Sequence, residues 1–509
     1  MASPMPHAEN RTRIVGLFLG LGIFILFLLS PAPEGMNPNG WKVLAVTALM
    51  ATWWITDAIP IPVTALLPIV LFPLLGILPP RATAAPYADD VIYLFMGGFF
   101  LAVAMERWNL HQRLALNIIK RTGTSPNMLV LGFMIATTFL SMWVSNTATA
   151  MMMIPIGLAV VSEVTGLTPS QLRLGAATGA DLNIGRALML AIAYSASVGG
   201  ITTIIGTPPN AIMVGTVNRL FDYQITFLDW MLVGVPLAIV TLAFVWVILT
   251  QFFFPAENFS RGDVSGLIDQ KLKDLGPWTK EEKAVAFIGV CMASMWILRG
   301  FVFKHFPALS MVNDSTIAIA GALMLFCWPR NIKKSEFLLD WKTAVNIPWN
   351  VVLLFGGGLA LANGFSHTDL TGYVGQHLMN LQGVHVFLVL IIVVILGGSL
   401  TEIVSTTATA TLIVPIMAAV ALAMGINPIG PMMAAALVCS YCFMLPVATP
   451  PNAIAYATGC FTIKDMAKVG ITINLLSLLL IPVVVYFLVP FFWGENLHIT
   501  PEWAQVARP

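Results

Sequence analysis

Charged side chains are scarce in this chain. They make up 10% of the 509 residues, whereas hydrophobic residues make up 58%, and the mean hydropathy is +0.86. A soluble domain carries about 25% charged residues, so this chain could not cover its own surface in water. The net charge is +1, and no block of five or six like charges provides a surface for nucleic acid. The composition predicts an integral membrane protein without a nucleic-acid partner.

Residues that usually carry catalysis or metal binding are also few. The five cysteines lie in or beside apolar segments and are interpreted as packing residues. The seven histidines show no metal-ligand spacing. We find no HExxH pair, Walker-type loop or plausible nucleophile–base pair, which disfavours an integral membrane enzyme. A channel would need a continuous polar pathway, and the sequence does not indicate one.

Long hydrophobic stretches dominate the rest of the chain. Eleven are long enough to cross about 30 Å of hydrocarbon. Two more, near 126–163 and 385–423, have Ser and Thr at their centres. Irregular backbone at membrane depth must be buried in protein or line a cavity. We therefore predict that each of these stretches is a re-entrant hairpin of two short helices. The eleven predicted spans lie near 14–30, 42–56, 60–79, 91–106, 187–215, 229–253, 283–299, 309–328, 349–364, 431–456 and 470–493.

Two motifs occur twice. Ser-Asn-Thr-Ala-Thr-Ala at 145–150 returns as Ser-Thr-Thr-Ala-Thr-Ala at 405–410, an offset of 260 residues. Thr-Pro-Pro-Asn-Ala-Ile at 207–212 returns unchanged at 449–454, an offset of 242. Hydrophobic sequence interrupted at matching places in two halves is typical of secondary transporters built from inverted repeats.

We therefore divide the chain into a first repeat over 1–254, a cytoplasmic linker over 255–282 with a short amphipathic helix, and a second repeat over 283–509. With the N-terminus in the cytoplasm and eleven crossings, 19 of the 25 Lys and Arg residues lie inside and 6 outside, as the positive-inside rule requires. The first hairpin then enters from the cytoplasm, the second enters from outside, and the C-terminus lies outside.

The repeated motifs indicate a particular chemistry. Paired prolines should break the helices at 187–215 and 431–456 and free the carbonyls of Gly206 and Ala448 to ligate a cation. Hairpin tips expose helix N-termini, which suit an anion. Because no Lys or Arg lies at either tip, a bound anion would need co-bound cations, and sodium matches hydroxyl and carbonyl ligands. The predicted helix breaks are at Thr207, Pro208, Pro209 and Pro451, with Pro450 beside the last.

Together with Trp-Trp-Ile-Thr-Asp-Ala-Ile-Pro at 53–60, these motifs resemble the divalent anion/sodium symporter family over nearly the whole chain. The resemblance implies transport of di- or tricarboxylates or sulfate, with sodium as coupling ion. It also implies an all-α homodimer in a bacterial inner (plasma) membrane, with a fixed scaffold and a transport domain that moves like an elevator. The implied first sodium site is Ser141, Ser145, Asn146 and the Gly206 carbonyl, and the second is Thr401, Thr406 and the carbonyls of Val404 and Ala448. The implied substrate residues are Asn146, Thr147, Thr406, Thr407, Thr449 and Pro450.

One position departs from the family pattern. Thr406 stands where the family commonly has Asn, so the second tip loses an amide N–H₂ donor. We predict sodium-coupled uptake of a C4-dicarboxylate such as succinate, fumarate or malate. A sodium-independent dicarboxylate/2-oxoglutarate exchanger and a sulfate or tricarboxylate symporter remain open alternatives. Glu402 lies beside the second tip, and two roles remain open for it: orienting the hairpin backbone, or taking part in coupling.

Overall fold

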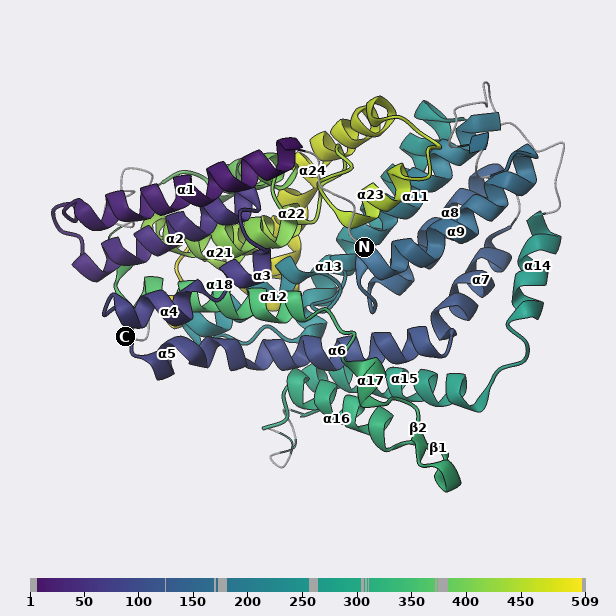
Figure 1. The fold of residues 1–509 in the computed structure, drawn as a ribbon, viewed down its shortest axis with the longest axis horizontal. Coiled ribbons are helices and arrows are strands. Elements are labelled where there is room, and N and C mark those ends of the chain that lie inside the picture. The colour runs from purple at the N-terminus through teal and green to yellow at the C-terminus, as the bar shows by residue number, and fades with distance from the viewer. Residues whose placement is uncertain are drawn as a thin grey trace.

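The computed structural model describes residues 7–123, 125–168, 171–172, 181–255, 264–303, 306, 309, 311–370, 373 and 383–505. This part of the chain is almost wholly helical (Figure 1). Its first half contains α1 (His7–Leu29), α2 (Pro38–Thr56), α3 (Ile61–Thr64), α4 (Leu67–Leu74), α5 (Pro80–Ala84), η1 (Ala85–Ala88), α6 (Asp90–Arg107), α7 (Leu110–Thr122), α8 (Pro126–Ser141), α9 (Asn146–Thr165), α11 (Asp181–Gly200), α12 (Pro208–Phe221), α13 (Phe227–Val247) and η2 (Ile248–Phe253). The remainder contains α14 (Val264–Asp274), α15 (Lys280–Phe301), α16 (Asp314–Cys327), β1 (Pro329–Asn331), η5 (Ile332–Lys334), β2 (Glu336–Phe337), α17 (Trp341–Ala344), α18 (Trp349–His367), α20 (Val386–Thr401), α21 (Thr406–Met424), α22 (Ile429–Cys439), α23 (Pro450–Tyr456), α24 (Ile463–Trp493) and α25 (Glu502–Gln505).

Local sequence explains where several long helices begin. The helices α13, α15 and α24 each start with a Thr whose side chain accepts a hydrogen bond from the N3 backbone, while an acidic N3 side chain accepts one from the Thr backbone. These reciprocal bonds satisfy backbone N–H groups that have no partner within the helix. The capping pairs are Thr226 with Asp229, Thr279 with Glu282, and Thr462 with Asp465.

Eight helical segments in the described chain are long and apolar enough to cross a membrane. Six of them, at α1, α6, α13, α15, α18 and α24, coincide with predicted spans. The prediction was wrong for 60–79, which is not one helix: α3 ends at Thr64 and α4 begins at Leu67. Large apolar side chains on α1 and α24 are exposed, such as Leu29 at 81% and Phe491 at 78%, as expected for surfaces in lipid.

The two Ser/Thr-rich stretches form helix pairs with a short turn at the motif. Residues 142–145 separate α8 from α9, and residues 402–405 separate α20 from α21. The expectation of two short helices was wrong for the second arm of each pair. Helices α9 and α21 have 20 and 19 residues and are themselves long enough to span, whereas α8 and α20 have 16 each.

Both Thr-Pro-Pro motifs lie at interruptions between helices. Helix α11 ends at Gly200 and α12 begins at Pro208, while α22 ends at Cys439 and α23 begins at Pro450. We call residues 201–207 the first link and residues 440–449 the second link. The prolines occupy the first helical positions of α12 and α23, where a missing N–H removes no helical hydrogen bond.

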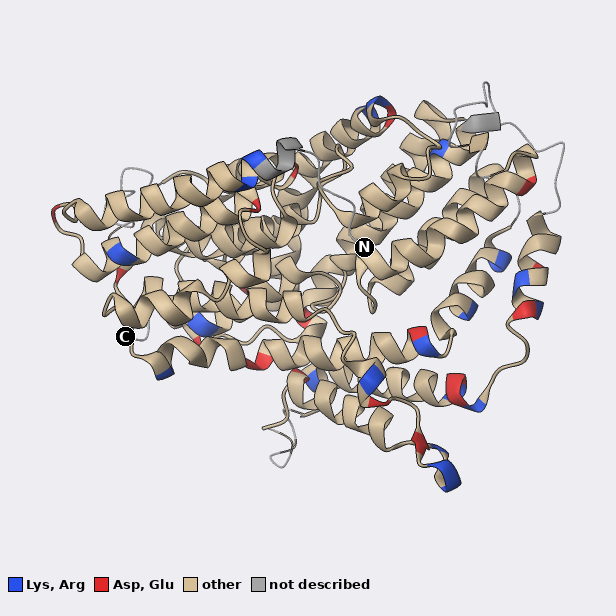
Figure 2. Ribbon diagram, viewed as in Figure 1, with Lys and Arg blue, Asp and Glu red and all other residues tan. Residues whose placement is uncertain are grey.

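The region between the halves contains the expected short helix, α14, with Val264 and Ile268 buried; residues 256–263 of the predicted linker lie outside the described chain. The strands β1 and β2 form a small antiparallel pair, which the all-α prediction missed. Charged residues lie mainly near the ends of the helices, and few lie in the central part of the molecule (Figure 2).

Packing crosses between the two halves. Helix α12, which follows the first link, packs against α21, and α23, which follows the second link, packs against α9. Each half-helix beyond a link therefore contacts the helix that begins at the opposite tip. Helices α6 and α16 pack along each other below them in Figure 1.

Candidate functional site

The first tip is organised by two serines. Ser145 is the N-cap of α9, and its hydroxyl accepts a hydrogen bond from Ala148 N at 3.3 Å. The hydroxyl of buried Ser141 lies 2.7 Å from both Asn146 Oδ1 and the carbonyl of Ala196. A hydroxyl has one proton, so Ser141 donates to one of these oxygens at a time. When it donates to Ala196, the Ser141 and Asn146 oxygens are both available to a cation.

The first link lies against this tip. Thr203 Oγ1 donates to the carbonyl of Met142 at 2.7 Å. A Cβ added at Gly200 would lie 2.6 Å from Asn146 Oδ1, and one added at Gly206 would lie 2.4 Å from the Gly200 carbonyl oxygen. The two glycines therefore allow the link to close on itself and to approach the Asn146 amide, which places the Gly206 backbone close to that of Gly200.

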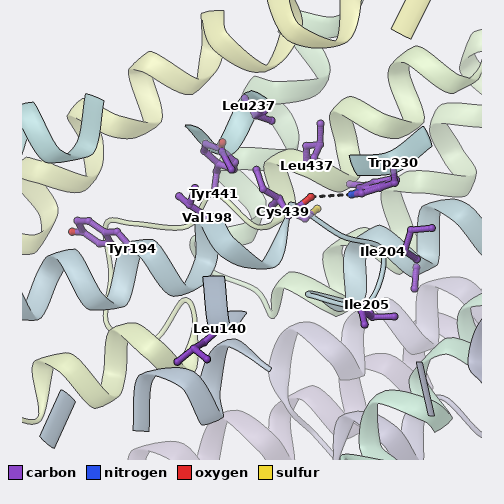
Figure 3. Close-up of a cluster of buried hydrophobic side chains, with 14 of the residues drawn as sticks. Leu140, Tyr194, Val198, Ile204, Ile205, Trp230, Leu237, Leu437, Cys439 and Tyr441 are labelled. Atoms are coloured by element: carbon purple, nitrogen blue, oxygen red, sulfur yellow. Dashed lines mark hydrogen bonds between the residues drawn. The ribbon is translucent and has the colours of Figure 1, made fainter. Parts of the chain in front are cut away.

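The link is also held from α13. Trp230 Nε1 donates to the carbonyl of Ile201 at 2.9 Å, the bond drawn in Figure 3. The same view shows Ile204 of the first link in one buried cluster with Cys439, the last residue of α22, and Tyr441 of the second link. Residues of both links therefore lie in the same hydrophobic core.

The second tip has a different arrangement. Thr401 occupies the place of Ser141 in the repeat, and its hydroxyl donates to the carbonyl of Cys439 at 2.8 Å. Buried Glu402 accepts hydrogen bonds from the backbone N–H groups of Phe443 at 2.9 Å and Met444 at 3.2 Å, and from Asn474 Nδ2 at 2.6 Å. These hydrogen bonds connect the carboxylate beside the tip to the second link and to α24.

The second link is more open than the first. All of 201–207 is buried, but Val447 in the second link is 83% exposed and Pro450 just beyond it is exposed. Tyr194 of α11 donates its hydroxyl hydrogen to the carbonyl of Phe443, at 3.0 Å. This contact ties the first broken helix to the second link.

The residues predicted to bind substrate are half-buried or lie at the link ends. Within the described chain, the hydroxyls of Thr147, Thr406, Thr407 and Thr449 donate no hydrogen bond, and no Lys or Arg donates one to these residues. The structure brings Ser141, Ser145 and Asn146 together with Gly200 and the first link. On the other side it places Thr401, Val404 and Thr406 at one tip, with Ala448, Thr449 and Pro450 at the end of the adjoining link.

Two features of the site were missed in the sequence. The bonding of Glu402 depends on residues about 40 and 72 positions away, which no local pattern encodes. Asn210 and Asn452, the fourth residues of the duplicated Thr-Pro-Pro motif, were not assigned a role, although their repetition was itself a signal.

Two solved structures whose fold is similar are those of transport proteins. The chain superposes with a TM-score of 0.57 on the Alcanivorax borkumensis YdaH transporter, at 14% identity and covering 96% of this chain and 99% of that one. It superposes with a TM-score of 0.56 on Neisseria gonorrhoeae MtrF, described as illuminating a class of antimetabolite efflux pumps, at 14% identity and 95% coverage of both chains. At this identity the likeness concerns the fold alone.

Sequence relatives are much closer. A sodium-dependent dicarboxylate transporter of Staphylococcus saprophyticus is 45% identical over 489 residues, covering 96% of this chain and 93% of the relative. The transporter of the same name from Staphylococcus aureus (strain USA300) is 45% identical over 487 residues, with the same shares covered. The family model for the sodium:sulfate symporter transmembrane region matches residues 11–498. The resemblance inferred from the duplicated motifs is thus confirmed, and this multi-pass membrane protein belongs to the sodium:sulfate symporter family, a family of transporters rather than enzymes.

Proposed function

We propose that the protein couples sodium entry to the uptake of a small dianion, a C4-dicarboxylate such as succinate, fumarate or malate. The relatives at 45% identity are named sodium-dependent dicarboxylate transporters, and they cover nearly the whole chain. The site geometry supports the same reading, because it offers many neutral donors and oxygen ligands without a basic side chain.

The single observation that carries the proposal is the set of unengaged polar groups at the two tips and the second link. Thr147 on one side and Thr406, Thr407 and Thr449 on the other donate no hydrogen bond within the described chain. Each hydroxyl donates one hydrogen bond, so the set, divided between the two sides, can bind two carboxylate groups at once. In our proposal Asn146 and Thr147 bind one carboxylate, and Thr406, Thr407, Thr449 and Pro450 surround the other.

Two sodium ions compensate the charge of the substrate in this scheme. The first is ligated by Ser141, Ser145, Asn146 and the Gly206 carbonyl, and the position of the Ser141 hydroxyl between two acceptors supports this. The second is ligated by Thr401, Thr406 and the carbonyls of Val404 and Ala448. Hydroxyl, amide and carbonyl oxygens are hard ligands suited to such an ion.

The larger architecture follows from the repeat. We propose that the halves 1–254 and 283–509 have opposite topology, with an N-terminus in the cytoplasm, a C-terminus outside and the linker 255–282 inside. The helix pairs 126–163 and 385–423 with the broken helices 187–215 and 431–456 form a transport domain. The remaining helices form the scaffold of a homodimer in a bacterial inner membrane, and transport proceeds by an elevator motion.

The test is uptake of radiolabelled succinate into proteoliposomes with an inward sodium gradient or with choline in place of sodium. The proposal requires that uptake depends on sodium and saturates with succinate. The variants Asn146→Ala and Thr147→Ala should abolish uptake while folding normally, as judged by melting in detergent. Wild-type rates in both variants would refute the site assignment, and rates independent of sodium would refute the coupling.

A second candidate is a sodium-independent exchanger, favoured by Thr406 in place of the common Asn. It predicts uptake only into vesicles preloaded with a dicarboxylate. Sulfate or a tricarboxylate is the alternative substrate, since the matched family carries sulfate in its name, and competition of each anion against labelled succinate distinguishes them.

A further inference from the structure

Each link is held by one buried asparagine. Asn210 Nδ2 donates to the carbonyl of Gly200 at 2.9 Å and to that of Thr203 at 2.7 Å. Asn452 Nδ2 donates to the carbonyl of Cys442 at 2.9 Å and to that of Leu445 at 3.1 Å. Both side chains are completely buried.

The two arrangements are equivalent within the repeat. The 242-residue offset that relates the Thr-Pro-Pro motifs also relates Gly200 to Cys442 and Thr203 to Leu445. The same side chain therefore bonds to the same two backbone positions in both halves, although the links differ in exposure and in their other supports. Because the two hydrogen bonds of each asparagine recur at the same positions of both links, we interpret them as specific to the links and not as a general feature of helix ends.

The geometry also fixes the direction of each amide. Only the N–H₂ group can donate to carbonyl oxygens, so each Oδ1 must point elsewhere. The Oδ1 atoms of Asn210 and Asn452 are buried and have no hydrogen-bond partner within the described chain. The amide thus uses its donors to shape the link, and its oxygen is not required for those bonds.

We propose that Asn210 and Asn452 are positioning residues that set sodium affinity. Their N–H₂ groups hold each link in the shape that aims the Gly206 and Ala448 carbonyls at the cations. The unwound backbone keeps only isolated turn bonds, such as Gly206 N to Thr203 O at 3.4 Å and Ala448 N to Leu445 O at 3.3 Å. Without the asparagine donors these bonds are too few to hold the carbonyl ligands in position. This inference rests on the proposed sodium coupling and adds two positioning residues to the proposed sodium ligands.

The experiment compares alanine and aspartate at each position. Asn210→Asp and Asn452→Asp keep the side-chain shape and one oxygen but replace both N–H donors by a second carboxyl oxygen. The ionised carboxylate donates nothing to the link carbonyls, whereas a protonated one keeps a single O–H donor, so sodium dependence is measured over a rising pH series. If the asparagines act through N–H₂, the aspartate variants lose sodium affinity as fully as the alanine variants. We expect the sodium concentration for half-maximal uptake to rise about tenfold or more, while the KM for succinate at saturating sodium changes less than twofold.

The matched control is Asn427→Ala. Asn427 is also fully buried and donates through Nδ2 to Glu495 at 2.8 Å and to the carbonyl of Asn496 at 3.3 Å, but it lies outside both links. This variant should melt at a lower temperature in detergent and retain the wild-type sodium dependence. A sodium-induced rise in melting temperature without succinate provides an independent readout of sodium binding for all variants.

The outcomes are distinct. Wild-type sodium dependence in both folded aspartate variants overturns the inference, and so does loss of affinity with alanine but not with aspartate, because it assigns direct ligation to Oδ1. If an alanine variant does not fold, the isosteric aspartate variant decides. A wild-type protein that does not respond to sodium refutes the proposed function itself, along with the inference.

Discussion

Replacing Gly206 by alanine tests the first sodium site with a single methyl group. A Cβ at this position would lie 2.4 Å from the Gly200 carbonyl oxygen and 3.0 Å from two further Gly200 backbone atoms. The first distance is about 1 Å shorter than ordinary van der Waals contact. All three are backbone atoms of Gly200, so rotating a side chain cannot relieve the conflict, and the link itself must shift.

The shift moves the proposed carbonyl ligand by a comparable amount. A misplacement of about 1 Å at a binding or reacting group can cost roughly 100-fold in rate, which corresponds to about 2.7 kcal/mol. We therefore expect Gly206→Ala to lower succinate uptake at limiting sodium by about 100-fold. At saturating sodium the loss should be smaller, because mass action restores occupancy of a weakened site.

The assay is the initial rate of labelled succinate uptake in proteoliposomes with equal amounts of reconstituted protein, over a series of sodium concentrations. Gly289→Ala is the matched control: it lies in α15, and an added Cβ would approach only the end of the Leu101 side chain, at 3.5 Å. It should transport normally. A Gly206→Ala protein with the wild-type sodium dependence would refute the assignment of this link as a ligand.

Three further substitutions have defined expectations. Glu402→Gln replaces a carboxylate that accepts hydrogen bonds from two backbone N–H groups of the second link. Because hydrogen bonds to charged groups are worth about 1.5–3 kcal/mol each, uptake should fall at least tenfold, and wild-type uptake would contradict a role of Glu402 in holding the second link. Arg113→Met leaves its buried partner Glu282, 2.8 Å away, without a counter-charge, so unfolding in detergent should become easier by about 3–5 kcal/mol, whereas an unchanged melting temperature would contradict the importance of the pair. Burial lowers the pKa of His111 below its ordinary value, so the unfolded chain binds a proton more readily than the folded protein, and stability should fall as pH drops below about 6.5. Between pH 8 and pH 5 the melting temperature of His111→Gln should therefore decline less steeply than that of the wild type, and equal declines would contradict this.

The helix ends at the site could be predicted because their signals are local. Two consecutive prolines disfavour a helix interior more strongly than one, and the pairs at 208–209 and 450–451 begin α12 and α23. Ser145 precedes the first residue of α9 and caps it with its own hydroxyl. Such features depend on a few neighbouring residues, so one sequence is enough to locate them.

Other features depend on distant parts of the chain and could not be predicted. Glu402 finds its donors on the second link and on α24. Arg113 finds Glu282 across 169 residues, although both appear in sequence as ordinary cytoplasmic charges. Periodicity and motifs specify elements, but they do not specify which elements become neighbours.

Thr406 stands where the first tip has the amide of Asn146, and the hydrogen bonds around the second tip explain why the second tip tolerates it. In the first tip Asn146 Oδ1 lies within hydrogen-bond distance of the Ser141 hydroxyl. In the second tip the equivalent hydroxyl, Thr401, donates to the Cys439 carbonyl, so the absence of an amide oxygen at 406 leaves no buried donor unpaired. Since an unpaired buried group, rather than a missing bond, carries the larger energetic cost, the substitution should change ligand affinity more than stability. Thr406→Asn should therefore leave the melting temperature nearly unchanged and alter the sodium dependence of uptake, and a large loss of stability with unchanged uptake would show that this comparison of the two tips is wrong.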